Sequence, residues 1–145
     1  MFDRISHIGI LVSDMDRALR VWRDGFGLKQ FKEAEIPAEG LHSVFLSVSG
    51  RPGEMTVELM EPVDPSDMSN PVARRLAKVG EGFYHLAVVV DDVDETAASL
   101  SDAGLRIIHR AALEGAAQGR WLVHPKDACG VMVEGVEEWS ELPSE

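Results

Sequence analysis

Two histidines and two glutamates occupy corresponding positions in the two halves of this 145-residue chain. His7 and His85 each stand near the start of an apolar stretch. Glu58 follows the first histidine by 51 residues, and Glu134 follows the second by 49. Imidazoles and carboxylates together suit a divalent first-row metal, which can polarise oxygen atoms of a substrate. The four residues therefore predict a metal site, provided that the fold brings them together.

An internal repeat explains the correspondence. The segment 5–16 recurs as the segment 83–94 at a constant offset of 78 residues. Each copy holds a histidine, an apolar run typical of a buried strand, and an aspartate, Asp14 or Asp92, that can accept a backbone N–H at the start of a helix. A single histidine on an apolar strand is more often a core residue than a ligand. Four polar residues in register are harder to explain in that way, because buried carboxylates need a partner.

Each half is predicted to run strand, helix, strand, strand, strand. Strands are expected over residues 5–12, 28–35, 41–48, 55–60, 83–90, 106–110, 120–123 and 131–136. Helices are expected over 16–26, 71–79 and 94–103. Helical spacing predicts that the first of these faces a sheet with Ala18, Leu19, Trp22 and Phe26, and the second with Val72, Leu76 and Val79.

The length fits one domain, and one strand–helix–strand–strand–strand unit alone could not bury a sizeable core. We therefore expect an α+β fold in which two βαβββ modules, related by a pseudo-twofold, form a curved mixed sheet around the metal site. The expected boundaries are module one at about 4–62, a linker with a short helix at about 63–81, module two at about 82–136, and an acidic tail at 137–145.

Composition narrows the class of partner. The net charge of −11 argues against non-specific nucleic-acid binding. No apolar run approaches the roughly 18–20 residues that cross a bilayer, so no membrane partner is expected. The single Cys129 cannot form an internal disulfide, and the N-terminus shows no signal peptide, which together favour a cytoplasmic protein. Exposed edge strands favour a homodimer.

Five phrases make the chain similar to the vicinal-oxygen-chelate superfamily and, within it, to the methylmalonyl-CoA epimerases. The similarity covers about residues 4 to 136. The matching phrases are Ile5-Ser6-His7-Ile8-Gly9-Ile10, Thr56-Val57-Glu58-Leu59-Met60-Glu61-Pro62, Gly80-Glu81-Gly82-Phe83-Tyr84-His85-Leu86-Ala87, His124-Pro125-Lys126-Asp127 and Gly130-Val131-Met132-Val133-Glu134.

The resemblance implies an isomerase that interconverts the (R) and (S) forms of methylmalonyl-CoA, or of a similar 2-substituted malonyl- or acyl-CoA, by proton transfer through a metal-stabilised enolate. It implies one divalent ion, cobalt, manganese, nickel or zinc, held by His7, Glu58, His85 and Glu134. Glu134 and Glu58 are the expected catalytic carboxylates.

Binding of the acyl-CoA substrate needs cations for its phosphates. Lys126 and Arg120 are expected to supply them from loops at the rim of the second half, with His124 orienting the loop or lining the pocket.

Several positions depart from the family, Ser43 and Gly135 among them. Ser43 stands where some relatives carry a glutamate proposed as an acid/base residue, and Gly135 stands where a larger apolar residue is usual. The alternatives are a glyoxalase-like lyase or isomerase of the same superfamily, a ring-cleaving dioxygenase, which would need only two histidines and one carboxylate, and a metal-free small-molecule binding or resistance protein.

Overall fold

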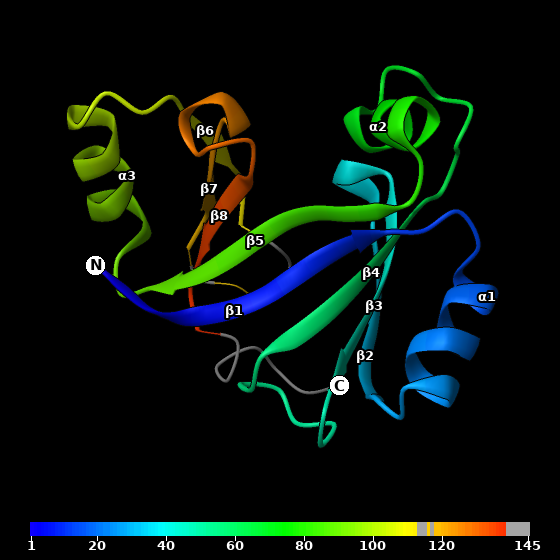
Figure 1. The fold of residues 1–145 in the computed structure, drawn as a ribbon. Helices are drawn as coiled ribbons and strands as arrows, with labels where there is room; N and C mark the ends of the chain where they lie inside the picture. Colours follow the sequence, from blue (N-terminus) through cyan, green and yellow to red (C-terminus); the bar gives the residue numbers. More distant parts are fainter. Residues whose placement is uncertain (113–115, 117, 139–145) are drawn as a thin grey trace. The chain divides into compact units, whose positions relative to one another are not determined.

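The computed structural model describes residues 1–112, 116 and 118–138. Over these residues the chain forms eight strands and three α-helices, so the predicted α+β class is confirmed (Figure 1). The strands are β1 (Phe2–Leu11), β2 (Lys29–Ile36), β3 (Leu41–Ser47), β4 (Thr56–Pro62), β5 (Gly82–Val90), β6 (Ile107–Arg110), β7 (Arg120–Val123) and β8 (Met132–Val136). The α-helices are α1 (Met15–Leu19), α2 (Pro71–Val79) and α3 (Val93–Asp102). The predicted order of strands and helices is confirmed in both halves.

The chain divides into two compact units, which are described separately. The middle unit comprises Ile8–Tyr84, and the terminal unit comprises Met1–His7 together with the segment from His85 onward. β1 and β5 therefore each contribute residues to both units. Within the described residues no helix is long and apolar enough to cross a membrane.

In the middle unit the strand order is β2-β3-β4-β1, and β3 pairs antiparallel with both β2 and β4. α1 covers one face (Figure 1), where Met15 and Ala18 pack with Val44 and Leu59. α2 packs through Val72 on a second apolar cluster, which contains Leu11, Leu41 and Met60. Because side chains alternate along a strand, Ser43 and Glu58 lie on the face opposite α1.

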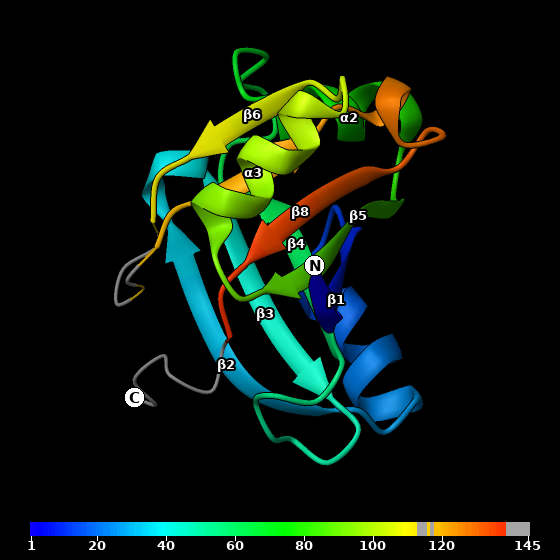
Figure 2. The same cartoon turned by 90° about the vertical axis from the view of Figure 1, so that its left-hand side faces the viewer.

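In the terminal unit the strand order is β1-β5-β8-β7-β6. β8 pairs parallel with β5 and antiparallel with β7, so the predicted mixed sheet is confirmed. α3 lies over one face of this sheet (Figure 2), where Val93 and Ala97 pack with Val88, Trp121 and Val123. The opposite face carries Ala87, Val89 and Val136, and by alternation it also carries His85, Arg120 and Glu134.

Both predicted helix caps are confirmed. The side chain of Asp14 accepts the Arg17 N–H at 3.2 Å, and the side chain of Asp92 accepts the Glu95 N–H at 2.9 Å. Each carboxylate satisfies an otherwise unpaired amide of a first helical turn.

The predicted helix over 16–26 is wrong in its second half. α1 ends at Leu19, and a π-helical segment, η1 (Arg20–Gly25), follows it. Phe26 donates its N–H to the Val21 carbonyl five residues earlier, at 2.8 Å. This wider turn rotates Phe26 away from the sheet, so that the residue is 66% exposed and its ring makes a T-shaped contact with Trp22, with ring centroids 5.2 Å apart.

The apolar stripe predicted for α2 is wrong at its last member. Val72 is buried and Leu76 packs beside it, but Val79 is 61% exposed. The helix extends one turn beyond the apolar surface on which Val72 packs and ends at Gly80. The predicted loop over 114–119 and the predicted tail fall largely outside the described residues, at 113–115, 117 and 139–145.

Candidate metal centre

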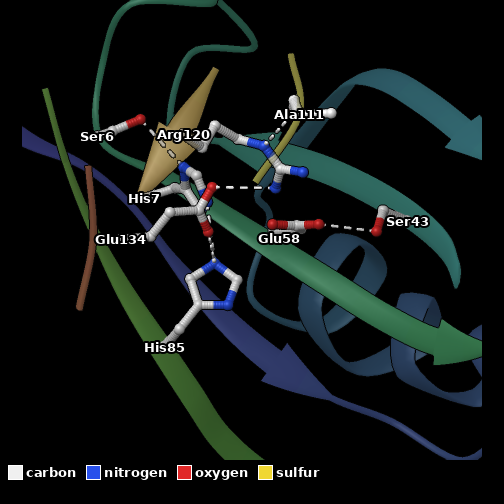
Figure 3. A network of polar contacts seen from close by, with 8 residues as sticks. All are labelled: Ser6, His7, Ser43, Glu58, His85, Ala111, Arg120 and Glu134. Atoms are coloured by element: carbon white, nitrogen blue, oxygen red, sulfur yellow. Dashed lines mark hydrogen bonds and ion pairs between the residues drawn. The ribbon is translucent and has the colours of Figure 1, made fainter. Parts of the chain in front are cut away.

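Three buried side chains of the types that bind metals converge in the terminal unit. His7, His85 and Glu134 each offer a ligand atom, and these atoms lie within 4.8 Å of one another (Figure 3). His7 Nε2 lies 3.0 Å from His85 Nε2, and Glu134 Oε2 lies 3.5 Å from His85 Nε2. The three residues are only 2%, 4% and 6% exposed. The site can therefore hold an ion that is largely screened from water.

Strand register accounts for this convergence. β5 and β8 run parallel, with His85 opposite Met132 and Ala87 opposite Glu134. Residues two apart on a strand share a face, so His85 and Glu134 are diagonal neighbours on the face opposite α3. The alternating valines of β5, which pack beneath α3, fix which face His85 takes.

The donor atoms fit a divalent metal. Two imidazole nitrogens 3.0 Å apart, with a carboxylate beside them, need a proton or a cation between them. Ser6 Oγ lies 3.0 Å from His7 Nδ1. With Nδ1 protonated and donating to this hydroxyl, Nε2 carries the lone pair that a metal binds, and the ring orientation is fixed. Ser6 was not singled out from the sequence, although a hydroxyl inside an apolar strand directly before a histidine is a usable signal.

Arg120 lies beside this cluster, as the first residue of β7 and not in a loop at the rim. Its side chain is 13% exposed. Its Nη1 lies 3.4 Å from Glu134 Oε1, and its Nε donates to the Ala111 carbonyl at 3.4 Å (Figure 3). The prediction that Arg120 lies in a loop at the rim is wrong, since its guanidinium is largely buried and paired with a predicted metal ligand. That Arg120 binds a phosphate of the substrate stays a prediction.

Lys126 lies in a short 3-10 turn, η3 (Pro125–Asp127), and His124 is the residue before it. His124 is not a member of the candidate metal cluster found among the described residues. The His124 side chain accepts the Lys126 N–H at 3.1 Å and so helps to orient the turn. Arg106 clamps the same turn, because its Nε and Nη2 donate to the two oxygens of Asp127 at 2.9 and 3.1 Å. This pairing lowers the pKa of Asp127 to about 2. Lys126 itself is exposed.

Glu58, the fourth predicted ligand, lies on β4 in the middle unit and is 5% exposed. Ser43 on β3 donates its hydroxyl to Glu58 Oε2 at 2.7 Å (Figure 3). Ser43 pairs with Met60, so it is a diagonal neighbour of Glu58 on one face. The hydroxyl gives the buried carboxylate a donor. That Glu58 joins the other three ligands stays a prediction.

Residues 6–123 match the Glyoxalase/Bleomycin resistance protein/Dioxygenase superfamily. The chain belongs to this superfamily. It is similar to the crystal structure of methylmalonyl-CoA epimerase from Mycobacterium tuberculosis, with 31% identity, 94% of this chain and 89% of that chain covered, and a TM-score of 0.81. A variant of the Streptomyces coelicolor methylmalonyl-CoA epimerase, in complex with 2-nitronate-propionyl-CoA, gives 30% identity, 96% and 99% coverage, and a TM-score of 0.82.

Sequence comparison agrees with the structural comparison. The mitochondrial methylmalonyl-CoA epimerase of Bos taurus is 28% identical over 134 residues, which cover 90% of this chain and 72% of the relative. The resemblance to methylmalonyl-CoA epimerases that the five phrases predicted is thus confirmed over most of the chain.

Proposed function

We propose that this protein is an isomerase that epimerises methylmalonyl-CoA or a similar 2-substituted malonyl-CoA thioester. The observation that carries the proposal is the buried cluster of His7, His85 and Glu134 in a chain that matches methylmalonyl-CoA epimerases over nearly its full length. One of these relatives is described with an acyl-CoA analogue, which supports a CoA thioester as the substrate class.

Epimerisation removes one proton from the carbon between a thioester and a carboxylate and returns a proton to the opposite face. His7, His85 and Glu134, joined in our proposal by Glu58, would hold a divalent metal. When bound, such an ion supplies Lewis-acid stabilisation of the negative charge that develops on the thioester oxygen.

Two carboxylates are proposed to move the proton. Glu134 is buried beside His85 and Arg120, and it acts as base toward one face of the carbon. Glu58 acts toward the other face, and the Ser43 hydroxyl holds its Oε2 in place at 2.7 Å. Some relatives carry a glutamate at the position of Ser43. Here the Ser43 hydroxyl instead holds the carboxylate of the neighbouring Glu58.

The CoA phosphates are proposed to bind at the η3 turn. Lys126 is exposed there, and the turn is held by His124 at its start and by Arg106, the residue before β6. A turn held at both ends presents a lysine with less conformational freedom to lose on binding.

Exchange of the α-proton of methylmalonyl-CoA in heavy water tests the reaction. We expect deuterium to enter at this carbon in the presence of cobalt or manganese, and the rate to fall by about three orders of magnitude, as for loss of a catalytic group, in His85→Ala. His109→Ala on exposed β6 is the matched control and should exchange like wild type.

Exchange that is equally fast in His85→Ala would contradict the assignment of the site. No exchange with any metal would reject the substrate, and turnover of the hemithioacetal of methylglyoxal and glutathione would then favour the glyoxalase-like alternative.

We also propose a homodimer. β2 and β6 each end the strand order of their unit, so each presents backbone groups that a second copy can pair. Light scattering coupled to size-exclusion chromatography tests this, and a mass equal to one chain would contradict it.

A further inference from the structure

The two carboxylate oxygens of Glu134 face different partners. Oε2 lies 3.5 Å from His85 Nε2, within the metal cluster, whereas Oε1 lies 3.4 Å from Arg120 Nη1. We propose that Arg120 is a positioning residue that confines Glu134 to a single ligating oxygen. The inference rests on the proposed metal centre, and it concerns how that centre is built.

The alternation of side chains along β7 fixes the face of the sheet on which the Arg120 side chain lies. On β7, Trp121 and Val123 are buried under α3, so the residues between and beside them take the opposite face. The Trp121 indole N–H donates to Thr96 Oγ1 on α3 at 2.9 Å, which locks this alternation. Leu122 pairs with Glu134 across β7 and β8, so Arg120 is the diagonal neighbour of Glu134.

Burial makes the contact between the two side chains effective. The Arg120 and Glu134 side chains are only 13% and 8% exposed, so water competes weakly for either group. A guanidinium stays protonated and presents its donors in a rigid planar fork. The guanidinium is held at a second point, since its Nε donates to the Ala111 carbonyl at 3.4 Å. Oε1 is therefore held by a fixed donor, and rotation of the carboxylate toward a two-oxygen mode would break that contact.

The positive charge of Arg120 and its role in orienting Glu134 predict opposite effects on metal affinity. A cation beside a metal site repels the metal, so removal of its charge alone would tighten binding. Loss of an outer partner that orients a ligand loosens binding, typically by 10–100-fold. Arg120→Lys separates the two effects, because it keeps the charge and removes the planar fork.

The test is titration of Co²⁺ into the purified protein without substrate, followed by visible absorption. We expect Arg120→Lys to bind Co²⁺ about 10-fold more weakly than wild type and to change the absorption bands, which report coordination number. Arg110→Lys is the matched control, since Arg110 is exposed and pairs directly with Arg120 across β6 and β7. It should leave both the affinity and the spectrum unchanged.

Wild-type affinity and spectrum in Arg120→Lys would overturn the proposal. If that variant does not fold, a crystal structure of the Co²⁺-loaded wild type decides: one ligating oxygen of Glu134, with Arg120 on the other, supports the proposal, and two ligating oxygens overturn it. The titration contains no substrate, so its result does not depend on whether the protein is an epimerase. A wild-type protein that binds no Co²⁺ would overturn both.

Discussion

The indole of Trp121 fills the space that a side chain at position 135 would need. A Cβ atom added to Gly135 would lie 2.0 Å from Trp121 Cε2, and the two residues pair directly across β7 and β8. Trp121 is fully buried, with Thr96 as hydrogen-bond acceptor for its N–H. The absence of a side chain at Gly135 is thus matched by a large residue on the neighbouring strand.

Gly135→Ala is expected to destabilise the protein by about 3 kcal/mol, because overpacking a filled core forces the ring or the strand to move. Urea unfolding measures the change. Gly25→Ala is the control, since a Cβ added there would lie 3.3 Å from the Arg20 carbonyl oxygen, and it should change the free energy of unfolding by less than about 1 kcal/mol. Equal effects would show that Trp121 yields to the new methyl group. The pair Trp121→Leu with Gly135→Ala should recover part of the loss, since contacting residues couple.

Ser43→Ala is expected to lower the free energy of unfolding by about 2 kcal/mol, because the buried Glu58 carboxylate loses a hydroxyl donor. On our proposal the epimerisation rate should also fall about 10-fold through lost orientation of Glu58. The exposed Ser99→Ala on α3 is the control and should change neither quantity. If Ser43→Ala leaves both stability and rate unchanged, Ser43 neither stabilises the buried Glu58 carboxylate nor orients it for catalysis.

His42 should make stability depend on pH. Burial opposes its protonation, but the hydrogen bonds that protonated His42 donates to Glu33 at 2.6 Å and to Glu61 at 3.4 Å outweigh burial and raise the pKa of His42. A raised folded pKa means that the contribution is complete below the unfolded value of about 6.5 and is lost as the pH rises through the folded value. We expect His42→Gln to cost about 1 kcal/mol near pH 6 and much less near pH 9, measured by urea unfolding. The same cost at both pH values would contradict this.

Arg106→Ala is expected to return the pKa of Asp127 from about 2 part of the way toward its ordinary value, because it removes the side-chain hydrogen bonds that lower the pKa most and keeps the backbone one. Carbon NMR of the carboxyl groups measures the shift. Both residues are at the surface, so stability should change little. On our proposal KM for the CoA substrate should rise roughly fivefold with little change in kcat. Arg110→Ala is the control. If Arg106→Ala has the same KM as this control, the η3 turn does not contribute to substrate binding.

The sequence repeat predicts most of this fold because the physical signals are local. A strand followed by a capping aspartate appears twice, and Asp14 and Asp92 cap their helices as expected. The bounds of α2 follow from Asn70 as N-cap, Pro71 at the first position and Gly80 at the end. His7, His85 and Glu134 are found because the repeat marks them.

What the sequence does not predict depends on geometry beyond the local pattern. The π-helical turn that exposes Phe26 differs from an α-helix by one residue per hydrogen bond, and the apolar spacing does not reveal it. The Arg120–Glu134 contact depends on the register of β7 against β8. Neither composition nor spacing fixes that register.

Epimerisation measured during a metal titration tests the central claim most directly. Metal-free protein would be mixed with one epimer of methylmalonyl-CoA, and NMR would follow appearance of the other as Co²⁺ is added. The account predicts a rate that rises in proportion to added metal, stops rising at one ion per chain, and is lost in His7→Ala. A rate that is independent of metal, or that is retained in His7→Ala, would contradict it.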